Sequence, residues 1–511
     1  MNTNMKCLAP FGEKAGVRGG NVVALTAASR APGVITHHPQ FRQRKRIHMC
    51  AMVLVVVIAL TFSLDAAEYR VSSAAEITRA SGEARPGDVL VMSGGEWKDQ
   101  AIVFGAKGTA EKPITLRAQI PGKVVLNGKS SVTIDGEHLV VSGLFLNDGQ
   151  LTGDGVKLAG RNNRLTGSAV LGGNYKFFVH LFGTSNRVDH CYLAGKTNDS
   201  PTLQVEVEGR HNYHQLDHNH FSHRPPLNRN GGETIRVGYS HQSMTNSGTL
   251  VENNLFERCD GEIEIISSKS CENIYRANTF LDCAGMLTLR HGNRCVVEGN
   301  FFIGHHKRGS GGIRVIGDDH VIINNYIDGV EKGGFWITSG ISNSELKGYF
   351  QSRNCVIAFN TFVDSRGPAI ELDAGFGTSG RTLRPENITI ANNVFALTSG
   401  NLLKGQEGGT GYKWMGNIAS PGGVEHAGIK FVEAKLERGA DGLWRPAKDS
   451  AVRGAAEGSF PSVNSDIDGQ PRLGRADAGC DQLSEAPITR RPLTAAEVGP
   501  AWMDAKARSA R

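Results

Sequence analysis

The stretch NNLFERCDGEIEIISSKSCENIYRANTFLDCAGMLTLRHGNRCVVEGNFF (Asn253–Phe302) decides the fold, because one short pattern occurs in it three times. In each copy an Asn is followed two residues later by a Phe, at Asn254, Asn278 and Asn300. Short runs of alternating apolar residues precede the copies. Alternation with a period of two predicts β-strands rather than helices.

The pattern continues on both sides of this stretch. Its Asn residues are Asn219, Asn254, Asn278, Asn300, Asn325, Asn360, Asn393 and Asn417. Successive Asn residues are 35, 24, 22, 25, 35, 33 and 24 positions apart, and at Asn325 the aromatic residue stands one place earlier. A period of 22–25 residues with occasional insertions predicts a right-handed parallel β-helix, whose coils stack at about 4.8 Å.

In such a helix the two repeated residue types have different places. We expect each Asn at a turn, bonded to the backbone of the next coil, and each Phe in the interior. Asn residues that only mark ordinary turns are the alternative.

The remaining sequence fits an all-β, single-domain protein with 64 Gly and few long amphipathic patterns. We expect a helix at Ser73–Ser81 as a short N-terminal cap, and strands at Ile114–Ala118, Val124–Leu126, Val132–Ile134 and Leu139–Leu146. The β-helix is expected over residues 68–424. Residues 425–511 are expected as an irregular C-terminal extension that packs on the helix or trails from it, weakly ordered after Ile488.

Residues 1–67 have the features of a secretory leader. Arg42, Arg44, Lys45 and Arg46 precede the uncharged apolar run 51–64, and small residues follow it. The run is short for a membrane span, so we expect a cleaved signal peptide and a secreted or periplasmic protein. An uncleaved N-terminal anchor is the alternative.

The leader also accounts for the basic composition. It holds eight of the 56 Lys and Arg and two of the 50 Asp and Glu, so 48 residues of each sign remain. A net charge of zero says nothing about partners, so affinity for an acidic polymer has to come from a local patch. No nucleic-acid partner is expected. No membrane attachment is expected after cleavage, and monomer and dimer both stay open.

Four cysteines, Cys259, Cys271, Cys283 and Cys295, are spaced by 12 residues. This spacing places Cys259 near Cys283 on the next coil, and Cys271 near Cys295. We expect buried thiols that pack in the core, and a metal site is the alternative.

Two carboxylates mark a candidate site within the same stretch. In a regular strand Glu262 and Glu264 would point to one face, about 7 Å apart. They repel each other unless a positive charge lies over them, and a hard cation such as Ca²⁺ would meet that need. Lys269 and Arg290 add two charged groups nearby, which is typical of a site for an acidic substrate.

Four motifs in order carry a resemblance to a known family. They are NGGETIRVG (Asn230–Gly238), EIEIISSK (Glu262–Lys269), LTLRHGN (Leu287–Asn293) and GGIRVIGDDHVIINNYI (Gly311–Ile327). From about Glu68 to about Asn417 the chain resembles polysaccharide lyase family 6, the alginate lyases and chondroitinase B. The resemblance implies a right-handed parallel β-helix and β-elimination at a uronic acid of an anionic polysaccharide such as alginate.

The resemblance also implies roles for particular residues. Lys269, five residues after Glu264, matches the catalytic base, and Arg290 matches the second catalytic residue, an acid or charge stabiliser. Because a guanidinium seldom gives up its proton, charge stabilisation or a relayed proton is the easier role for Arg290. Asn230, Glu262 and Glu264 match the calcium ligands of the family, and Glu233 is a further candidate ligand or a partner of Arg236.

Other residues near these motifs are candidates for substrate binding. They are His291, Arg314, Arg236, His220 and Arg224. Arg314 and Arg236 are expected to bind carboxylates, or else to pair with local acids. His220 and Arg224 are placed at one end of the groove.

Two other functions stay open from the sequence. A lyase acting on dermatan sulfate would need extra arginines for sulfate, for which Arg381 and Arg384 are the candidates. A catalytically silent β-helix that binds polysaccharide is the third possibility, although a pure binding protein has no use for a base.

Overall fold

The computed structural model describes residues 66–396, 401–408, 410–420 and 425–509. The predicted signal peptide with its apolar core at 51–64 lies outside the described residues. From Leu64 to Arg511 the chain forms one compact unit. Neither of the two α-helices in the described part is long and apolar enough to cross a membrane.

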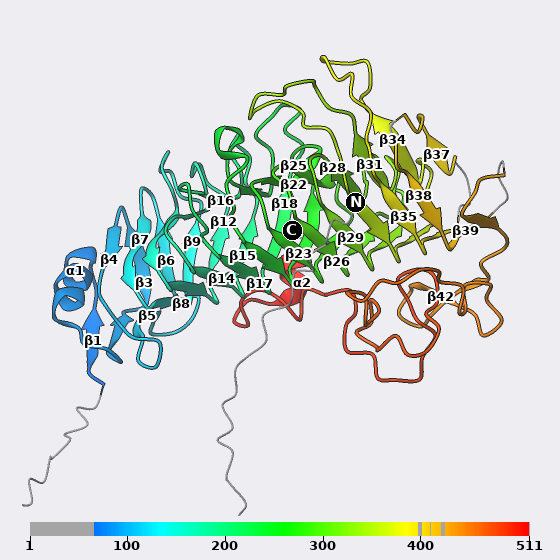
Figure 1. Cartoon of the computed structure of the whole chain (residues 1–511). Coiled ribbons are helices and arrows are strands. Elements are labelled where there is room, and N and C mark those ends of the chain that lie inside the picture. The colour runs from blue at the N-terminus through cyan, green and yellow to red at the C-terminus, as the bar shows by residue number, and fades with distance from the viewer. Residues whose placement is uncertain (1–65, 397–400, 409, 421–424, 510–511) are drawn as a thin grey trace, which may run out of the picture. The chain divides into compact units, whose positions relative to one another are not determined.

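Nearly all regular structure lies in three parallel sheets that run side by side along the coil axis (Figure 1). The first sheet contains β1 (Glu68–Val71), β2 (Val89–Met92), β5 (Ile114–Ala118), β8 (Leu139–Ser142), β11 (Arg164–Thr166), β14 (Arg187–Asp189), β17 (Gln215–Asp217), β20 (Leu250–Glu252), β23 (Ile274–Arg276), β26 (Val296–Glu298), β29 (Val321–Ile323), β32 (Val356–Ala358), β35 (Thr389–Ala391) and β38 (Lys413–Met415). The second contains β4 (Ala101–Phe104), β7 (Ser131–Glu137), β10 (Val156–Arg161), β13 (Val179–Leu181), β16 (Leu203–Val205), β19 (Ile235–Val237), β22 (Glu264–Lys269), β25 (Met286–His291), β28 (Ile313–Val315), β31 (Phe335–Thr338), β34 (Ile370–Ala374) and β37 (Leu403–Lys404). The third contains β3 (Gly95–Lys98), β6 (Val124–Asn127), β9 (Leu144–Asn147), β12 (Ala169–Leu171), β15 (Tyr192–Ala194), β18 (His220–Arg224), β21 (Leu255–Cys259), β24 (Thr279–Leu281), β27 (Phe301–Ile303), β30 (Tyr326–Asp328), β33 (Thr361–Val363), β36 (Val394–Ala396), β39 (Asn417–Ser420) and β40 (Ile429–Phe431).

This arrangement confirms the predicted parallel β-helix. From β2 to β39, consecutive strands belong to different sheets, and each strand pairs in parallel with the strand one coil further on. The predicted run Leu139–Leu146 is interrupted, since it forms β8 and β9 with Gly143 between them at φ 75°. A glycine adopts that positive φ without strain, so the chain turns the corner of the coil there.

The predicted Asn ladder is present at the turn before the third sheet. From Asn219 to Asn417, each side-chain Nδ2 donates to the Oδ1 of the next Asn in the series at 2.9 or 3.0 Å. The same Oδ1 accepts the backbone N–H of the preceding Asn, so each Asn side chain bonds to the backbone of the preceding coil and not, as expected, to that of the next coil. Asn325 keeps its place in the ladder, because only the aromatic side chain is displaced there.

The Phe residues of the pattern stack inside the helix. Ring centroids of Phe221, Phe256, Phe280 and Phe302 follow each other at 5.0, 4.7 and 4.5 Å. All four are buried. Ile327 continues the row by pairing with Phe302.

The described cysteines support the interpretation as buried thiols. All seven are free and buried. The backbone N–H of Cys259 lies 3.4 Å from the Sγ of Cys283, which confirms that these two thiols stack on adjacent coils.

The first coil is covered by α1 (Ala74–Glu83), close to the predicted helix. Ser73 is its N-cap, and the Ser73 side chain accepts a hydrogen bond from the backbone N–H of Glu76. Ile77 is fully buried, and the helix packs against β4 at the end of the core. An N-terminal helix of this kind protects the open end of a solenoid from solvent and from edge pairing.

The C-terminal extension returns along the outer face of the third sheet (Figure 1). It begins with the antiparallel pair β41 (Leu436–Arg438) and β42 (Trp444–Pro446). Further on, Leu493 N–H donates to Thr279 of β24, and Trp502 Nε1 donates to the carbonyl of Gly167 beside β12. The expectation of weak order after Ile488 is wrong, because the residues from there to α2 (Ala505–Ser509) pack on the β-helix.

Candidate active site

The candidate residues gather on the outer face of the second sheet. Strand register places Gln204, Arg236, Ser267, Thr288, Arg314 and Trp336 in one row across β16, β19, β22, β25, β28 and β31. Their sequence neighbours, such as Val237, Leu287 and Val315, are fully buried. Burial therefore alternates along β19, β28 and β31, as expected for a strand with one face in the core.

Two irregularities in the pairing of β22 with β25 adjust the direction of the key side chains. The first leaves Ile265 as an extra residue, so that Ile265 and Ile266 both enter the core. The second leaves Arg290 extra, so that Lys269 lies opposite His291 with Arg290 beside them. Bulges of this kind re-aim side chains next to functional sites.

The start of β22 corrects the arrangement predicted for the Glu pair. Glu264 opens β22, whereas Glu262 lies before the strand in a bend, so the two are not on one regular strand. They are still close enough for the charge of Glu264 to act on Glu262.

Three carboxylates form the centre of the site. Both oxygens of Glu233 and Oε1 of Glu262 are buried, and none accepts a hydrogen bond from the described chain. Burial, together with the charges of Glu233 and Glu264, raises the pKa of Glu262 to about 8. Glu264 is better compensated, because the Ser267 hydroxyl donates a hydrogen bond to its Oε2.

Cationic side chains surround these carboxylates on both sides. Lys269 Nζ lies 3.6 Å and Arg236 Nη1 lies 3.7 Å from Glu233 Oε1. Arg290 Nε and Arg314 Nη1 lie 3.9 and 3.7 Å from Glu264 Oε1. The four cationic side chains are 11–15% exposed, so each is mostly buried but still reaches solvent. Arg314 also has a buried Nε without a described acceptor.

His291 is fixed beside Arg290. Its Nε2 lies 3.1 Å from Ser240 Oγ, and its Nδ1 lies 3.3 Å from Arg290 Nη1. Burial, with the positive charges of Arg290 and Lys269, lowers the pKa of His291 to about 2. The imidazole is therefore neutral at any working pH.

Two of the predicted substrate-binding residues lie away from this surface. His220 is on β18 of the third sheet, fully buried, with Nε2 2.9 Å from Glu257. Arg224 is 1% exposed, and its guanidinium donates to the carbonyls of Lys196, Asn198, Ser200, Gly231 and Gly232. Because neither side chain reaches solvent, the predicted contact of His220 and Arg224 with substrate is wrong. Arg224 instead supports the loop that carries Asn230 and Glu233.

Several side chains of the site carry oxygen donors that could bind a cation. Among the described residues, no group of three or more His, Cys, Asp or Glu side chains has the arrangement to hold a metal ion. Asn230 is exposed on the preceding loop and contributes a donor of another type. The oxygens of Glu233 and Glu262 that accept no hydrogen bond from the described chain are hard donors, so the residues present fit a hard cation chemically.

One loop over the site was not found from the sequence. Residues 339–354, between β31 and β32, bring Tyr349 over Arg290, with Arg290 Cζ 4.1 Å from the ring centroid. Arg381, considered only for sulfate, lies with its Cζ 4.5 Å from the same ring. In the sequence, the 35-residue spacing between Asn325 and Asn360 indicates an insertion in this coil, because an ordinary coil has 22–25 residues. The spacing does not indicate over which face the inserted loop folds.

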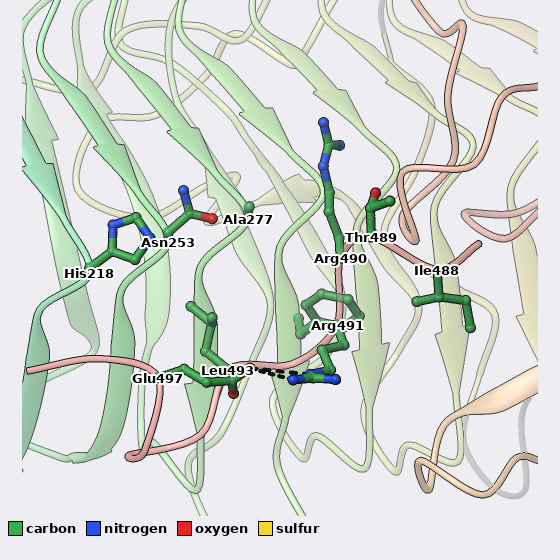
Figure 2. Close-up of a pocket in the computed structure, with 10 residues that line it drawn as sticks. His218, Asn253, Ala277, Ile488, Thr489, Arg490, Arg491, Leu493 and Glu497 are labelled. Atoms are coloured by element: carbon green, nitrogen blue, oxygen red, sulfur yellow. Dashed lines mark hydrogen bonds and ion pairs between the residues drawn. The ribbon is translucent and has the colours of Figure 1, made fainter.

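A cavity of about 350 Å³ lies elsewhere, between the turns of the helix and the C-terminal extension (Figure 2). Ile488, Arg491 and Leu493 of the extension face His218 and Asn253 across it. None of the predicted site residues lines this cavity.

The protein is thus a parallel β-helix that carries acidic and basic side chains together on the outer face of one sheet. The sequence model of the chondroitinase B family matches residues 71–408, and the chain belongs to this family, polysaccharide lyase family 6. A search among curated proteins finds no significant match.

Solved structures agree with this assignment. The PL6 family alginate lyase AlyGC is 34% identical with a TM-score of 0.70, over 83% of this chain and 60% of that chain. A mannuronic acid specific family 6 lyase from human gut microbiota is 33% identical with a TM-score of 0.65, over 72% of this chain and 91% of that one. The family 6 lyase Pedsa3628 from Pseudopedobacter saltans is 27% identical with a TM-score of 0.67, over 85% and 100%. The chain thus spans 60% of the length of AlyGC.

Proposed function

We propose that the protein is a secreted lyase that cleaves alginate by β-elimination and leaves unsaturated uronate ends. The observation that carries the proposal is the position of Lys269 and Arg290 on neighbouring strands, beside three carboxylates, two of which have buried oxygens that accept no hydrogen bond from the described chain. The alginate lyase AlyGC and the mannuronic acid specific lyase support this substrate class.

The reaction needs a base, and Lys269 is suited to that role. Lys269 is the last residue of β22, and it lies opposite His291 and next to Arg290. In its neutral form it would take the C5 proton of a uronate bound across the strands. Glu233, at 3.6 Å, keeps the amine in place between turnovers.

The negative charge that develops on the substrate carboxylate needs positive partners. Arg236 and Arg314 flank the site in the same outward row, and the unpaired Nε of Arg314 is available to a carboxylate oxygen. When bound, a Ca²⁺ ion held by Asn230, Glu233, Glu262 and Glu264 would neutralise the substrate carboxylate and so acidify the C5 proton.

His291 contributes as a neutral, fixed group. Because the pKa of His291 is about 2, it donates no proton from an imidazolium. Its contacts with Ser240 and Arg290 instead hold Arg290 toward the substrate.

Dermatan sulfate is the second candidate substrate, since the matching family model is that of chondroitinase B. The sulfate-binding pair suggested by the sequence is weakened, because Arg384 Nε donates to Asp373 Oδ2 at 3.0 Å. Of the two arginines, only Arg381 remains near the site, where its guanidinium lies against the ring of Tyr349. A silent binding protein is disfavoured, since it would not need a lysine held against a buried carboxylate.

The test follows the unsaturated uronate by its ultraviolet absorbance. Alginate, polymannuronate, polyguluronate and dermatan sulfate are supplied separately, each with and without a chelator. Growth of absorbance on an alginate substrate, suppressed by chelator and restored by Ca²⁺, is the expected result. Growth on dermatan sulfate alone would replace alginate as the substrate, and no growth on any polymer would overturn the lyase proposal.

Secretion has its own test. The apolar run 51–64 predicts cleavage just after it, so the exported protein should begin close to Glu68. Mass spectrometry of the protein exported from an expressing cell measures this end. An intact N-terminus that stays with the membrane fraction would favour the anchor instead.

A further inference from the structure

Arg224 is a buried arginine that the proposed reaction does not use. It is the last residue of β18 and is 1% exposed. Its guanidinium makes five hydrogen bonds of 2.7–3.2 Å, all of them to main-chain carbonyls and none to a carboxylate. Because a buried charge without an ionic partner is costly, its presence here needs a physical reason.

The five carbonyls belong to two loops on successive coils. Three lie in residues 196–200, between β15 and β16, and two lie in residues 230–233, between β18 and β19. The strands that flank the two loops are paired, β15 with β18 and β16 with β19. Arg224 therefore joins the earlier loop to the loop that carries Asn230 and Glu233.

The loop with Glu233 is also in close contact with the following coil. A Cβ added to Gly261 would collide with the carbonyl oxygen of Gly232 and would lie 2.8 Å from Cγ of Arg224. The two backbones therefore touch, with no room for a side chain between them. Glu233 follows Gly232 directly and Glu262 follows Gly261, so this contact brings the two buried carboxylates onto adjacent positions of neighbouring coils.

Arg224 also places a positive charge next to these carboxylates. Burial lowers the pKa of Arg224 to about 10, while the charges of Glu233 and Glu262 act to raise it. The guanidinium therefore stays charged at working pH. A lysine would not replace it, because an ammonium has three donors and lacks the planar fork that reaches carbonyls of both loops.

A hard cation at this place needs oxygen donors from two coils. Asn230 and Glu233 lie on the loop before β19, and Glu262 and Glu264 lie at or just before the start of β22, one coil further on. Where donors have to be ordered on binding, the cost of ordering is subtracted from the affinity. A residue outside the ligand set that fixes the loop beforehand therefore strengthens binding.

We propose that Arg224 is a positioning residue for the cation site, because it clamps residues 230–233 between the coil before them and the coil after them. This inference rests on the Ca²⁺ site of the proposed function. Arg224 contacts neither the cation nor the substrate, since it is buried and directed at main-chain carbonyls. Residues 196–200 hold no candidate ligand, yet they are coupled to the cation through Arg224.

The first experiment measures Ca²⁺ affinity by isothermal calorimetry for the wild type, Arg224→Lys and Arg508→Lys. Arg508 is the matched control, because it is 2% exposed and its guanidinium donates to four main-chain carbonyls, but within the C-terminal extension. We expect Arg224→Lys to weaken Ca²⁺ binding by about 10- to 100-fold and Arg508→Lys by less than about twofold. Thermal unfolding with chelator shows that both variants are folded and compares their stabilities.

Hydrogen exchange on the wild type tests the coupling without any variant. Ca²⁺ should slow amide exchange in residues 196–200 as well as in residues 230–233 and 260–264, and should leave residues 500–508 unchanged. Turnover gives a third measurement. The kcat of Arg224→Lys on alginate should return to within about threefold of wild type at saturating Ca²⁺, because mass action restores the bound state and the proposed base is untouched.

Unchanged Ca²⁺ affinity in a folded Arg224→Lys would overturn the proposal. Equal losses in the two variants would overturn it as well, since affinity would then follow general stability. If Arg224→Lys does not fold, the exchange experiment decides, and protection limited to residues 230–264 would exclude the clamp. A wild type that binds no Ca²⁺ would remove the metal part of the proposed function and this inference with it, whereas the ultraviolet assay judges the lyase activity separately.

Discussion

Lys269 Nζ lies 3.6 Å from Oε1 of Glu233, a fully buried carboxylate that accepts no hydrogen bond from the described chain. If Lys269 is the base, Lys269→Ala should lower kcat by about 10²- to 10⁴-fold, because no other amine lies at this position. Lys430→Ala, at an exposed residue of β40, is the control and should keep full activity. The ultraviolet assay measures both, and turnover that survives Lys269→Ala would remove it as the base.

Arg290 should be needed for its charge and its shape. Arg290→Ala is expected to abolish turnover while the protein stays folded, because the core below it is formed by Leu287 and Leu289. Arg290→Lys keeps the charge but loses the planar contact with Tyr349, so we expect only partial recovery of kcat. Circular dichroism checks the fold, and full activity of the Ala variant would contradict the assignment.

Glu262→Gln combined with Glu264→Gln should weaken Ca²⁺ binding by at least about tenfold, since two anionic oxygen donors are lost. Isothermal calorimetry on the purified protein measures the affinity without any substrate. Glu252→Gln, on the first sheet with its carboxylate paired to Arg276, is the control. If the wild type shows no affinity for Ca²⁺, the metal part of the mechanism is wrong.

The raised pKa of Glu262 predicts how stability depends on pH. In the metal-free folded state this carboxyl keeps its proton up to about pH 8, whereas its ordinary pKa is 4.5. Between these values the unfolded chain binds fewer protons, so the free energy of unfolding falls as pH rises.

The corresponding measurement is the melting temperature from about pH 5 to about pH 8, with chelator. Wild type should lose more stability over this range than Glu262→Gln, which has no proton to release. Saturating Ca²⁺ should remove the difference in slope, since the cation compensates the carboxylate. Parallel curves with chelator would show that Glu262 titrates normally.

Asn300 should be among the residues on which stability depends most. Its Nδ2 donates to Tyr275, Glu298 and Asn325, and its Oδ1 accepts two hydrogen bonds from Asn278. Asn300→Ala leaves buried partners unsatisfied and should cost about 3–5 kcal/mol in chemical denaturation. Asn401→Ala, at an exposed side chain, should cost less than about 0.5 kcal/mol. Similar losses for the two variants would refute this role of the ladder.

Much of the fold could be predicted from the sequence because each coil of a solenoid repeats the same local structure. The Asn and Phe ladders need equivalent residues at equivalent places on successive coils, and the spacing from Asn219 to Asn417 reports that directly. The family resemblance and the nearby motifs, rather than the repeat, brought Lys269, Arg290, Arg236 and Arg314 together as one candidate site, and all four lie on one sheet face. His220 and Arg224 were misplaced, because nearness in sequence to a motif does not say which of the three sheets a strand joins.

The sequence by itself determined the coil, its period and the residues that form its ladders, because these depend on local alternation and on contacts repeated at a fixed interval. The tertiary structure alone decided where the coil departs from that regularity. The extra residues Ile265 and Arg290 set the direction of the side chains proposed for catalysis, and the insertion after β31 brings Tyr349 over Arg290. A bulge or a folded-over loop is set by packing against distant residues, and such packing leaves no periodic signal in the chain.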